Sequence, residues 1–500
     1  MSFPSIVICL FSLILTSCAK KYSFRSRAQE PSEIRIGVLG KPELNWMKGD
    51  PFSKAVVSQL VEPLIELELK EGKLQLVGRI IRKWDFSSPL LFNIQMDESS
   101  HWDDGTLVTA QQLVESWRSL LATSENPNHT LLSCILNAKA FSERAVPFSS
   151  VGITIVSPSQ LQIRFQNPCP NFPFLLTQLP LTPRLNYPWS LTSGRLLPCP
   201  FRSEGPWMLE SFFTSNEILL KPNPHLATPV LAGNRLRFQF LSQMKEARSL
   251  MQDKQLDLVL LEKNPPLSNE DKIQSFVSPN SIVLTFNPNR KPFQNLKVRE
   301  WLIQGISRNE LIRLIGFPAI ESTRLFSFFE GEMNAPEFHP DSTPRDKKWI
   351  DSLGTAFQLA VPHQPVLQAI AKNLKAQWKK NLNLDVELIS SENNENAMMS
   401  LQHFKPDFSK RSLGLEEWAK FSTFDFFSPL HASLGTPQET APFKLYEQKL
   451  LKMEQWAVAE EKWVMPLVSL KQNILIQPNI SLPEQLPFRE TFTFKNIRVH

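Results

Sequence analysis

Two stretches of this 500-residue chain show the pattern of a strand, a helix and a second strand in succession. In the first stretch, Leu236, Phe238 and Phe240 alternate with polar residues, as a half-buried strand does. A helical pattern covers 243–252, and an apolar run follows at 256–261. Such a unit places its two strands parallel in one sheet and its helix over a face of that sheet. The pattern therefore predicts an α/β fold.

The second stretch has the same order. Residues 356–361 form an apolar run, and Pro365 suits the first turn of a helix because its missing N–H has no partner there anyway. The apolar face of this helix and the alternating residues of the returning strand are Val366, Ile370, Leu374 and Trp378, then Leu384, Val386 and Leu388. A second parallel pair is therefore predicted.

Two capping boxes mark further helix starts. In a capping box, a side chain at each end of the first turn bonds a backbone N–H at the other end. Thr109 with Gln112 and Ser307 with Glu310 both fit this pattern, and apolar residues at helical spacing follow each of them. We interpret those apolar residues as core positions. Alternating residues at 34, 36 and 38 predict another half-buried strand.

The first eighteen residues combine a short apolar run with a cysteine. The run at 6–15 is too short to span a bilayer core of ~30 Å, but it suits the central region of a secretion signal. Leu15-Thr16-Ser17-Cys18 resembles a bacterial lipobox, which implies cleavage before Cys18 and acylation of its thiol. Residues 1–17 would then be a signal peptide and 18–30 a lipidated tether. An ordinary signal peptide with a chance cysteine is the alternative. The segment departs from the usual signal pattern in one respect, since residues 1–5 carry no Lys or Arg.

Charge and cysteine content exclude several classes of protein. The net charge is +5, and the basic residues are scattered, so we expect no nucleic-acid partner. The chain has no Cys-x-x-Cys pair and no His/Cys cluster with zinc spacing, so we expect no metal and no cofactor. Cys169 and Cys199 both stand between prolines, and either a bridge between them or two free thiols fits the sequence.

The most specific motif runs from His101 to Ala110 (His-Trp-Asp-Asp-Gly-Thr-Leu-Val-Thr-Ala), with Ser116-Trp117-Arg118 following it. A lone Asp-Gly would indicate only a turn. Together with Leu60-Val-Glu-Pro-Leu64, Gly72 and Trp84, this block resembles the amino-terminal signature of the extracellular solute-binding proteins of family 5. That family comprises the large oligopeptide, dipeptide and nickel receptors of ABC importers.

Further blocks follow in the family's order. They are Glu204–Leu209, Leu219–Pro224, Leu284–Asn287, Pro292–Arg299, the helix 366–379 with the strand 384–388, and Pro466–Leu467. The chain also departs from the family pattern. Asp253-Lys254-Gln255 stands where a glycine is usual, and the early Leu-Asp-Pro is missing near 42–51.

The resemblance implies a periplasmic-binding-protein-like α/β fold of the large three-domain form, class II. Two lobes would enclose the ligand and would be joined by hinge strands near Leu284–Asn287 and Leu475–Asn479. The implied division assigns 31–66, 191–285 and 479–500 to lobe I, 67–190 to an accessory domain of lobe I, and 286–478 to lobe II. We expect a monomer.

The ligand-binding block is the most altered part of the resemblance. Peptide-binding members carry Ala-Asp-Tyr, and here Glu416-Glu417-Trp418 precedes Phe424. The resemblance places Glu417 where the family's Asp pairs with the α-ammonium of a peptide. Glu416 takes this role instead if the register slips by one residue. Alternatively, Glu417 is a solvated acidic residue on the surface with no role in ligand binding. Trp418 replaces Tyr and lines either the cleft or the core.

The resemblance implies a lipoprotein of the cell envelope that captures peptides and delivers them to an ABC permease. It would face the periplasm or the cell surface and be held to a membrane through Cys18. Another ligand stays open: a wall-derived peptide, a metal chelate or haem. A surface lipoprotein without a transport role also remains an open alternative. We expect no enzyme, because neither Gly-x-Ser-x-Gly nor His-Glu-x-x-His occurs in the chain.

Overall fold

The computed structural model describes a defined set of residues. These are 33–39, 51–70, 73–123, 126–183, 202–212, 217–226, 235–261, 271–315, 319–322, 324–325, 356–390, 397–404, 451–452, 454–482, 494–495 and 497–499.

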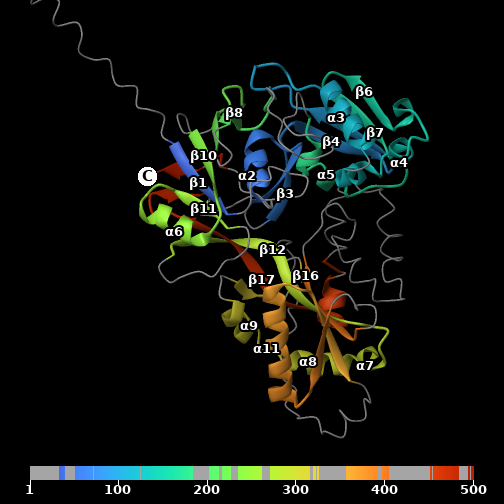
Figure 1. Cartoon of the computed structure of the whole chain (residues 1–500). Coiled ribbons are helices and arrows are strands. Elements are labelled where there is room, and N and C mark those ends of the chain that lie inside the picture. The colour runs from blue at the N-terminus through green and yellow to red at the C-terminus, as the bar shows by residue number, and fades with distance from the viewer. Residues whose placement is uncertain are drawn as a thin grey trace, which may run out of the picture.

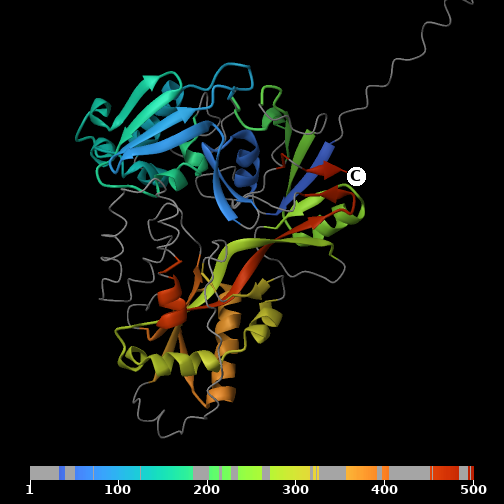
Figure 2. The same ribbon diagram turned by 180° about the vertical axis from the view of Figure 1, so that it is seen from behind.

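Three bodies make up the described structure, and two long strands reach from the upper pair to the lower one (Figure 1). We call the described residues of 33–61, 202–261 and 477–499 the first lobe. Those of 64–183 form the accessory domain beside it, and those of 287–463 form the second lobe. The long strands are β12 (Ile273–Phe286) and β17 (Val464–Ile476). The view from behind shows the same arrangement (Figure 2).

One eleven-stranded sheet runs through both lobes. Its order is β15-β14-β16-β12-β17-β11-β1-β10-β9-β8, and β13 pairs with β17 off this path. Strand β12 pairs with β17 along most of its length. Because each strand of this pair also has a neighbour at one end, β16 for β12 and β11 for β17, the pair joins the two halves of the sheet.

The first lobe is built around β1, whose parallel neighbours are β10 and β11. The alternating residues Ile34, Ile36 and Val38 of β1 are fully buried, as predicted. The elements of this lobe are β1 (Glu33–Leu39), α2 (Pro51–Leu60), β8 (Trp207–Phe212), β9 (Glu217–Pro222), β10 (Arg235–Leu241), α6 (Met244–Gln252), β11 (Leu258–Leu260), β18 (Ile480–Ser481) and β19 (Arg498–Val499). The first predicted strand–helix–strand unit is confirmed as β10–α6–β11, with β1 inserted between its two strands.

The accessory domain has its own antiparallel sheet, in the order β4-β5-β7-β6, and a separate hairpin of β2 and β3. Its apolar core includes the fully buried Trp102, Trp117 and Phe172. The elements are β2 (Ile65–Lys70), β3 (Lys73–Gly78), β4 (Ile81–Ser88), β5 (Leu91–Met96), α3 (Ala110–Ala122), η2 (Pro127–Leu132), α4 (Ala138–Ser142), η3 (Phe148–Ser150), β6 (Ile153–Ser157), β7 (Gln160–Arg164), α5 (Phe172–Leu175) and η4 (Leu179–Leu181).

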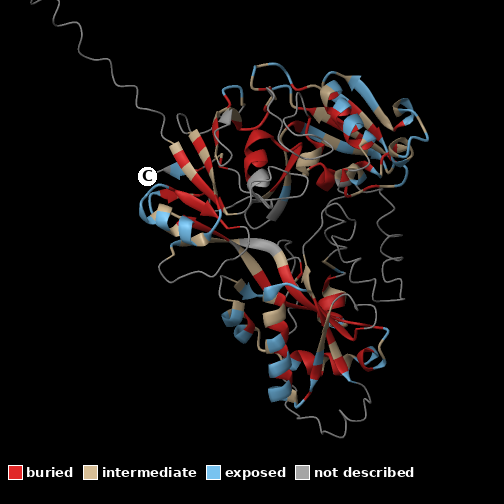
Figure 3. Cartoon of the chain, viewed as in Figure 1, coloured by how far each residue is buried: buried red, intermediate tan, exposed pale blue. Residues whose placement is uncertain are grey.

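The second lobe packs helices against the lower half of the large sheet. Its elements are α7 (Lys291–Gln294), α8 (Leu296–Gln304), α9 (Arg308–Ile315), β13 (Ala319–Glu321), β14 (Phe357–Val361), α11 (Pro365–Leu382), β15 (Val386–Ser390), β16 (Met399–Phe404) and the π-helix η6 (Gln455–Glu460). Strands β14 and β15 are parallel neighbours, which confirms the second predicted unit. Helix α11 starts with Pro365 and buries one side against the sheet (Figure 3).

Local signals in the sequence account for several element ends. The capping box at Thr109 is formed, and both of its reciprocal bonds to Gln112 are present. Helix α9 begins at the second predicted box, but the N–H of Ser307 donates to Gln377 Oε1 of α11 at 2.5 Å. Because α9 packs against α11, the backbone N–H of Ser307 has a hydrogen-bond acceptor from another helix. Helix α11 ends at Leu382, and its C-cap residue Asn383 adopts φ 53°.

Cys169 is a buried free thiol in the accessory domain, so the bridge to Cys199 that the sequence allowed is not formed at Cys169. Cys199 itself lies outside the described residues. None of the helices that the structure describes is long and apolar enough to cross a membrane.

Candidate functional site

The residues predicted to bind a ligand or a lipid lie outside the described part of the chain. These are Cys18, Glu416, Glu417 and Trp418. Within the described ranges, no group of three or more His, Cys, Asp or Glu side chains could hold a metal ion. The structure does describe two features that bear on function. One is a polar junction between the accessory domain and the first lobe, and the other is the strand pair that connects the lobes.

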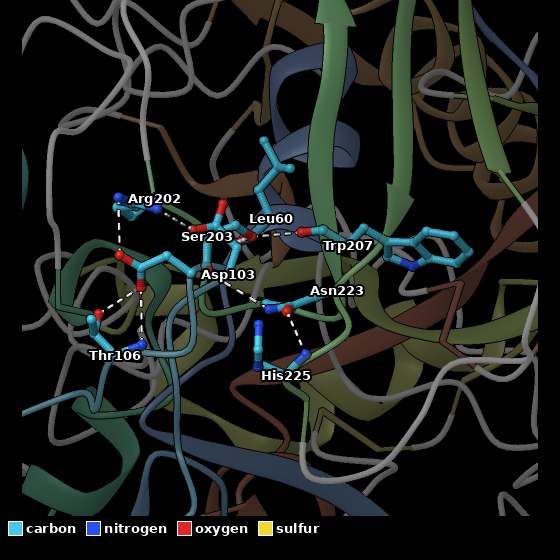
Figure 4. Close-up of polar contacts among 10 residues, drawn as sticks. Leu60, Asp103, Thr106, Arg202, Ser203, Trp207, Asn223 and His225 are labelled. Atoms are coloured by element: carbon cyan, nitrogen blue, oxygen red, sulfur yellow. Dashed lines mark hydrogen bonds and ion pairs between the residues drawn. The ribbon is translucent and has the colours of Figure 1, made fainter.

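The polar junction brings together four sequence blocks that the family resemblance had singled out separately (Figure 4). The turn 102–106 of the accessory domain meets Ser203 of the first lobe, and the N–H of Asp103 donates to Ser203 O at 2.8 Å. Ser203 Oγ lies 2.6 Å from Leu60 O at the end of α2 and 2.5 Å from Trp207 O at the start of β8. One hydroxyl is therefore shared between two carbonyl groups of different elements.

Asn223 extends this network to the end of β9. Its side-chain amide donates to Gly205 O at 3.0 Å, and its carbonyl oxygen accepts the N–H of His225 at 3.0 Å. Gly205 must be glycine, because a Cβ there would lie 2.4 Å from the carbonyl carbon of Leu60. The chain thus passes so close to the end of α2 that backbone meets backbone.

Ion pairs also contribute to the polar junction. Arg202 Nη2 lies 2.9 Å from Asp104 Oδ2, and Arg202 Nη1 lies 3.5 Å from Asp103 Oδ1. Burial raises the pKa of the Asp103 carboxyl above its ordinary value, even though Ser203 and Arg202 act in the opposite direction. Hydrogen bonds from the side chain and N–H of Thr106 lower the pKa of Asp104. The polar groups of the junction hold backbone segments together, which suits a rigid joint rather than a catalytic centre.

The sequence motifs include Asp103, Gly205 and Asn223 but not Arg202, Ser203 or His225. The ring of His225 lies 3.0 Å from where a Cβ of Gly105 would stand, and Gly105 has φ +82°. His225 directly follows one of these motifs and Arg202 lies two residues before another, so their position in the chain was a usable signal. Their partners lie about a hundred residues away in sequence, so only the fold reveals those contacts.

The strand pair β12–β17 changes register near its middle. Pairing is regular up to Val277 with Lys471, then shifts before Ser281 with Ser469, and shifts again between Ile282 and Val283. The sequence of the irregular part includes Pro279, which has no N–H to donate to a ladder. The break lies between the part of the pair that adjoins β11 and the part that adjoins β16.

Small polar side chains line this middle part. Ser281 Oγ lies 3.3 Å from Ser469 Oγ, and both residues are buried. Ser275 Oγ donates to Asn473 Oδ1 at 2.8 Å. The two serine side chains that face each other across the strand pair are small. The backbone there can therefore bend with less repacking of side chains than it could between two large apolar residues.

Each end of β17 is held firmly. In the first lobe, the N–H of Gln477 donates to Asp257 O at 2.9 Å, and the carboxylate of Asp257 accepts two bonds from the guanidinium of Arg35. In the second lobe, Arg299 stacks on Trp463, with 3.6 Å from its guanidinium carbon to the ring centre. The strand pair is therefore fixed at its ends and irregular between them.

Arg299 is almost fully buried and makes specific contacts. Its Nε donates to Glu461 O at 2.7 Å, its Nη2 lies 3.0 Å from Glu461 Oε2, and its Nη1 donates to Phe293 O. Burial lowers the pKa of Arg299 to about 10, so the side chain stays charged near neutral pH. It ties α8 to the segment that leads into β17.

Two lobes joined by a pair of crossing strands, with an accessory domain on the first lobe, define the class of three-domain binding proteins. The unliganded open form of the periplasmic murein tripeptide binding protein MppA has the same fold, with a TM-score of 0.75, 19% identity and 94% and 98% of the two chains covered. Peptide-bound OppA of Listeria monocytogenes gives a TM-score of 0.57 at 16% identity, with 93% and 99% covered.

Residues 75–423 match the family model described as bacterial extracellular solute-binding proteins, family 5 middle, and the chain belongs to this family. It is 25% identical to a putative binding protein of Haemophilus influenzae over 56% of this chain and 51% of that protein. A dipeptide-binding protein of Lactococcus lactis is 21% identical over 95% of each chain. The periplasmic murein peptide-binding protein MppA of Escherichia coli is 23% identical over 78% and 77%.

Proposed function

We propose that this protein captures peptides between its two lobes and delivers them to an ABC permease. The observation that carries the proposal is the two-lobed arrangement on β12 and β17, which is similar to an unliganded open peptide-binding protein over 94% of the chain. Relatives named for dipeptides, oligopeptides and murein peptides support a peptide as the ligand.

The chemistry of peptides suits such a device. Peptide backbones repeat the same donors and acceptors whatever their side chains, so a receptor that pairs with the backbone tolerates many sequences. Specificity then comes from length and from the terminal charges. We propose that Glu417 pairs with the ammonium group of the peptide, with Glu416 as the alternative, and that Trp418 lines the cleft.

We propose the domain division implied by the family resemblance: 31–66 with 191–285 and 479–500, then 67–190, then 286–478. Closure would bend β12 and β17 where their pairing is irregular, near 277–281, because both ends of β17 are held by other contacts. This point lies nearer the middle of the strands than the hinge positions expected from sequence. The rigid junction at Ser203 would make the accessory domain move with the first lobe.

We further propose that the protein is a lipoprotein, with 1–17 as signal peptide and the lipid on Cys18. Two or three acyl chains hold a protein stably on a membrane, whereas one chain does so only marginally. This anchor would place the binding lobes in the cell envelope, facing the periplasm or the cell surface, and near a permease.

A wall-derived peptide is a second candidate ligand. Two observations favour it: the Glu416-Glu417-Trp418 block departs from the family's Ala-Asp-Tyr, and one of the relatives is named as a murein peptide-binding protein. Murein tripeptide and ordinary tripeptides of similar length would separate the two candidates in one competition assay.

The proposal is tested by adding ligand to the purified protein. A ligand that binds only the folded state stabilises it by about 2.7 kcal/mol at a hundred times its Kd. We expect mixtures of di- to hexapeptides to raise the melting temperature and, because the lobes close, to reduce the radius of gyration in small-angle scattering. If no mixture changes either quantity, peptide capture is refuted.

A further inference from the structure

The β2–β3 hairpin lies between the upper bodies and the second lobe. It forms a two-stranded sheet of its own, and both views place it just above the connecting strand β12 (Figures 1 and 2). A lone hairpin of this kind is marginally stable in water and needs another apolar surface to pack on. What its two faces contact therefore decides its role.

The apolar face of the hairpin is buried, and part of it packs away from the core of its own domain. Leu67 of β2 is 5% exposed and Phe174 of α5 is 2% exposed. Both residues are packed in the apolar cluster that otherwise consists of residues 282–468, in the second lobe and its connecting strands. Leu76, the partner of Leu67 across the hairpin, packs against this cluster and also against the core of the accessory domain.

The apolar residues two positions before Leu67 and Phe174 pack in a different core. Ile65 and Phe172 are both fully buried, and both belong to the core of the accessory domain. The N–H of Ile65 donates to Leu176 O at 3.3 Å, which fastens the base of β2 to the end of α5. Within one strand and one short helix, apolar residues two positions apart therefore pack in two different cores.

The opposite face of the hairpin is ionic. Arg79 Nε lies 2.5 Å from Glu66 Oε2 and 3.4 Å from Glu62 Oε1, and Arg79 also pairs with Glu68. Glu62 in turn lies 3.6 Å from Lys495 Nζ, next to Phe494 in the core of the first lobe. These contacts attach the hairpin to the first lobe and the accessory domain.

We propose that the β2–β3 hairpin, together with Phe174, is a contact between lobes that sets how far the second lobe opens, with Leu67 and Phe174 as positioning residues. Its ionic face holds it to the upper bodies, and its apolar face rests on the apolar cluster below. The contact is non-covalent and lies beside the strands that bend, so it limits their movement without blocking it. The inference rests on the proposed function only in assuming that the lobes move.

The test uses the full protein without any added peptide. Fluorophores placed at Glu115 of α3 and Lys375 of α11, both exposed, report the distance between the accessory domain and the second lobe. Phe174→Ala is compared with Phe172→Ala, a matched control in the same helix. We expect Phe174→Ala to broaden and shift the distance distribution. We expect Phe172→Ala to lower the melting temperature and to leave the distribution of the folded molecules unchanged.

If Phe174→Ala does not fold, Phe174→Leu and Leu67→Ala take its place, and hydrogen exchange is followed at 65–70 and 73–78. Faster exchange in these strands together with a broader distance distribution supports the proposal. The proposal is overturned if any folded variant of Phe174 or Leu67 has a distance distribution with the same width and the same mean as the unmutated protein. Peptide capture is judged separately: if peptide leaves the distance in the unmutated protein unchanged, the proposed function fails while the contact between lobes stands.

Discussion

Asp103 and Asp104 are neighbours in sequence, yet their surroundings shift their pKa values in opposite directions from 3.8. Asp103 holds its proton more tightly in the folded protein, so its contribution to stability weakens as the pH rises through its folded pKa. Asp104 holds its proton less tightly, so its contribution is present above 3.8 and is lost as the pH falls through its folded pKa.

These opposite signs can be measured with two variants. Relative to the unmutated protein, we expect Asp103→Asn to gain stability as the pH rises above 3.8. We expect Asp104→Asn to lose stability as the pH rises toward 3.8 from more acid solutions. Urea unfolding across the acid range gives both curves, and parallel curves would contradict the environments described for the two carboxylates.

The most direct prediction about the ligand concerns Glu417. In a closed cleft, its carboxylate and the peptide ammonium would both be largely dry. Removing one partner of a buried pair costs on the order of 3–5 kcal/mol, because the other charge is left uncompensated. We therefore expect Glu417→Gln to lose roughly two to three or more decades of affinity, measured by calorimetry with free peptide.

The controls for Glu417 use the ligand as well as the protein. Amino-acetylated peptide should bind the unmutated protein about as poorly as free peptide binds Glu417→Gln, and the two defects should not add, since both delete one contact. If Glu416→Gln is the impaired variant instead, the register is off by one residue. If neither variant matters and acetylated peptide binds well, this block does not recognise an amino terminus.

At the scale of elements, Arg299 determines how the second lobe holds β17. Two of its bonds go to Glu461 and one to Phe293 O, and its guanidinium plane stacks on Trp463. A lysine keeps the charge but not the planar fork, so the exchange is not conservative here. Hydrogen bonds from a charged group are worth about 1.5–3 kcal/mol each, so we expect Arg299→Lys to destabilise the second lobe by about 3 kcal/mol or more.

The matched control for Arg299 is Arg118→Lys, because the side chain of Arg118 is 54% exposed. Substitutions at such sites usually stay within about 0.5 kcal/mol. Denaturant unfolding followed by tryptophan fluorescence compares the two variants. Equal stability of both would mean that the stacked guanidinium does not hold the start of β17.

The elements also show where sequence patterns succeed. Helix α11 was predicted from Pro365 and an apolar face that includes Ile370, Leu374 and Trp378, and all of these features are present. The capping box at Thr109 formed because both of its partners lie within one turn. At Ser307, a side chain from another helix supplies a partner for the N–H, and no local pattern can reveal such a competitor.

At the scale of the whole molecule, the proposed lipid on Cys18 would determine where the protein works. Cys18→Ala removes the thiol that we propose to be acylated, so we expect the variant to leave the membrane fraction or to accumulate as an unprocessed precursor. Fractionation and metabolic labelling with palmitate check this. Equal labelling of the variant and the unmutated protein would show that the lipid lies elsewhere.

Only part of the candidate site could be predicted from the sequence. The blocks around Asp103, Gly205 and Asn223 were visible as separate motifs, but the contacts of Asp103 and Asn223 with Ser203 O, and of Asp104 with Arg202, were not. Backbone carbonyls such as Leu60 O carry no sequence signature of their own. Contacts of this kind depend on where the chain returns, which is a property of the packed structure.

The sequence by itself determined the fold class, both parallel units, the helix starts and the family. These features rest on short-range periodicity, on caps within one turn and on motif order, which a linear pattern can hold. Only the tertiary structure decided that Leu67 and Phe174 pack in the second lobe's cluster while Ile65 and Phe172 stay in their own domain. Apolar residues of one strand or helix look alike in sequence, and the body that each one joins depends on which surfaces the folded chain brings together.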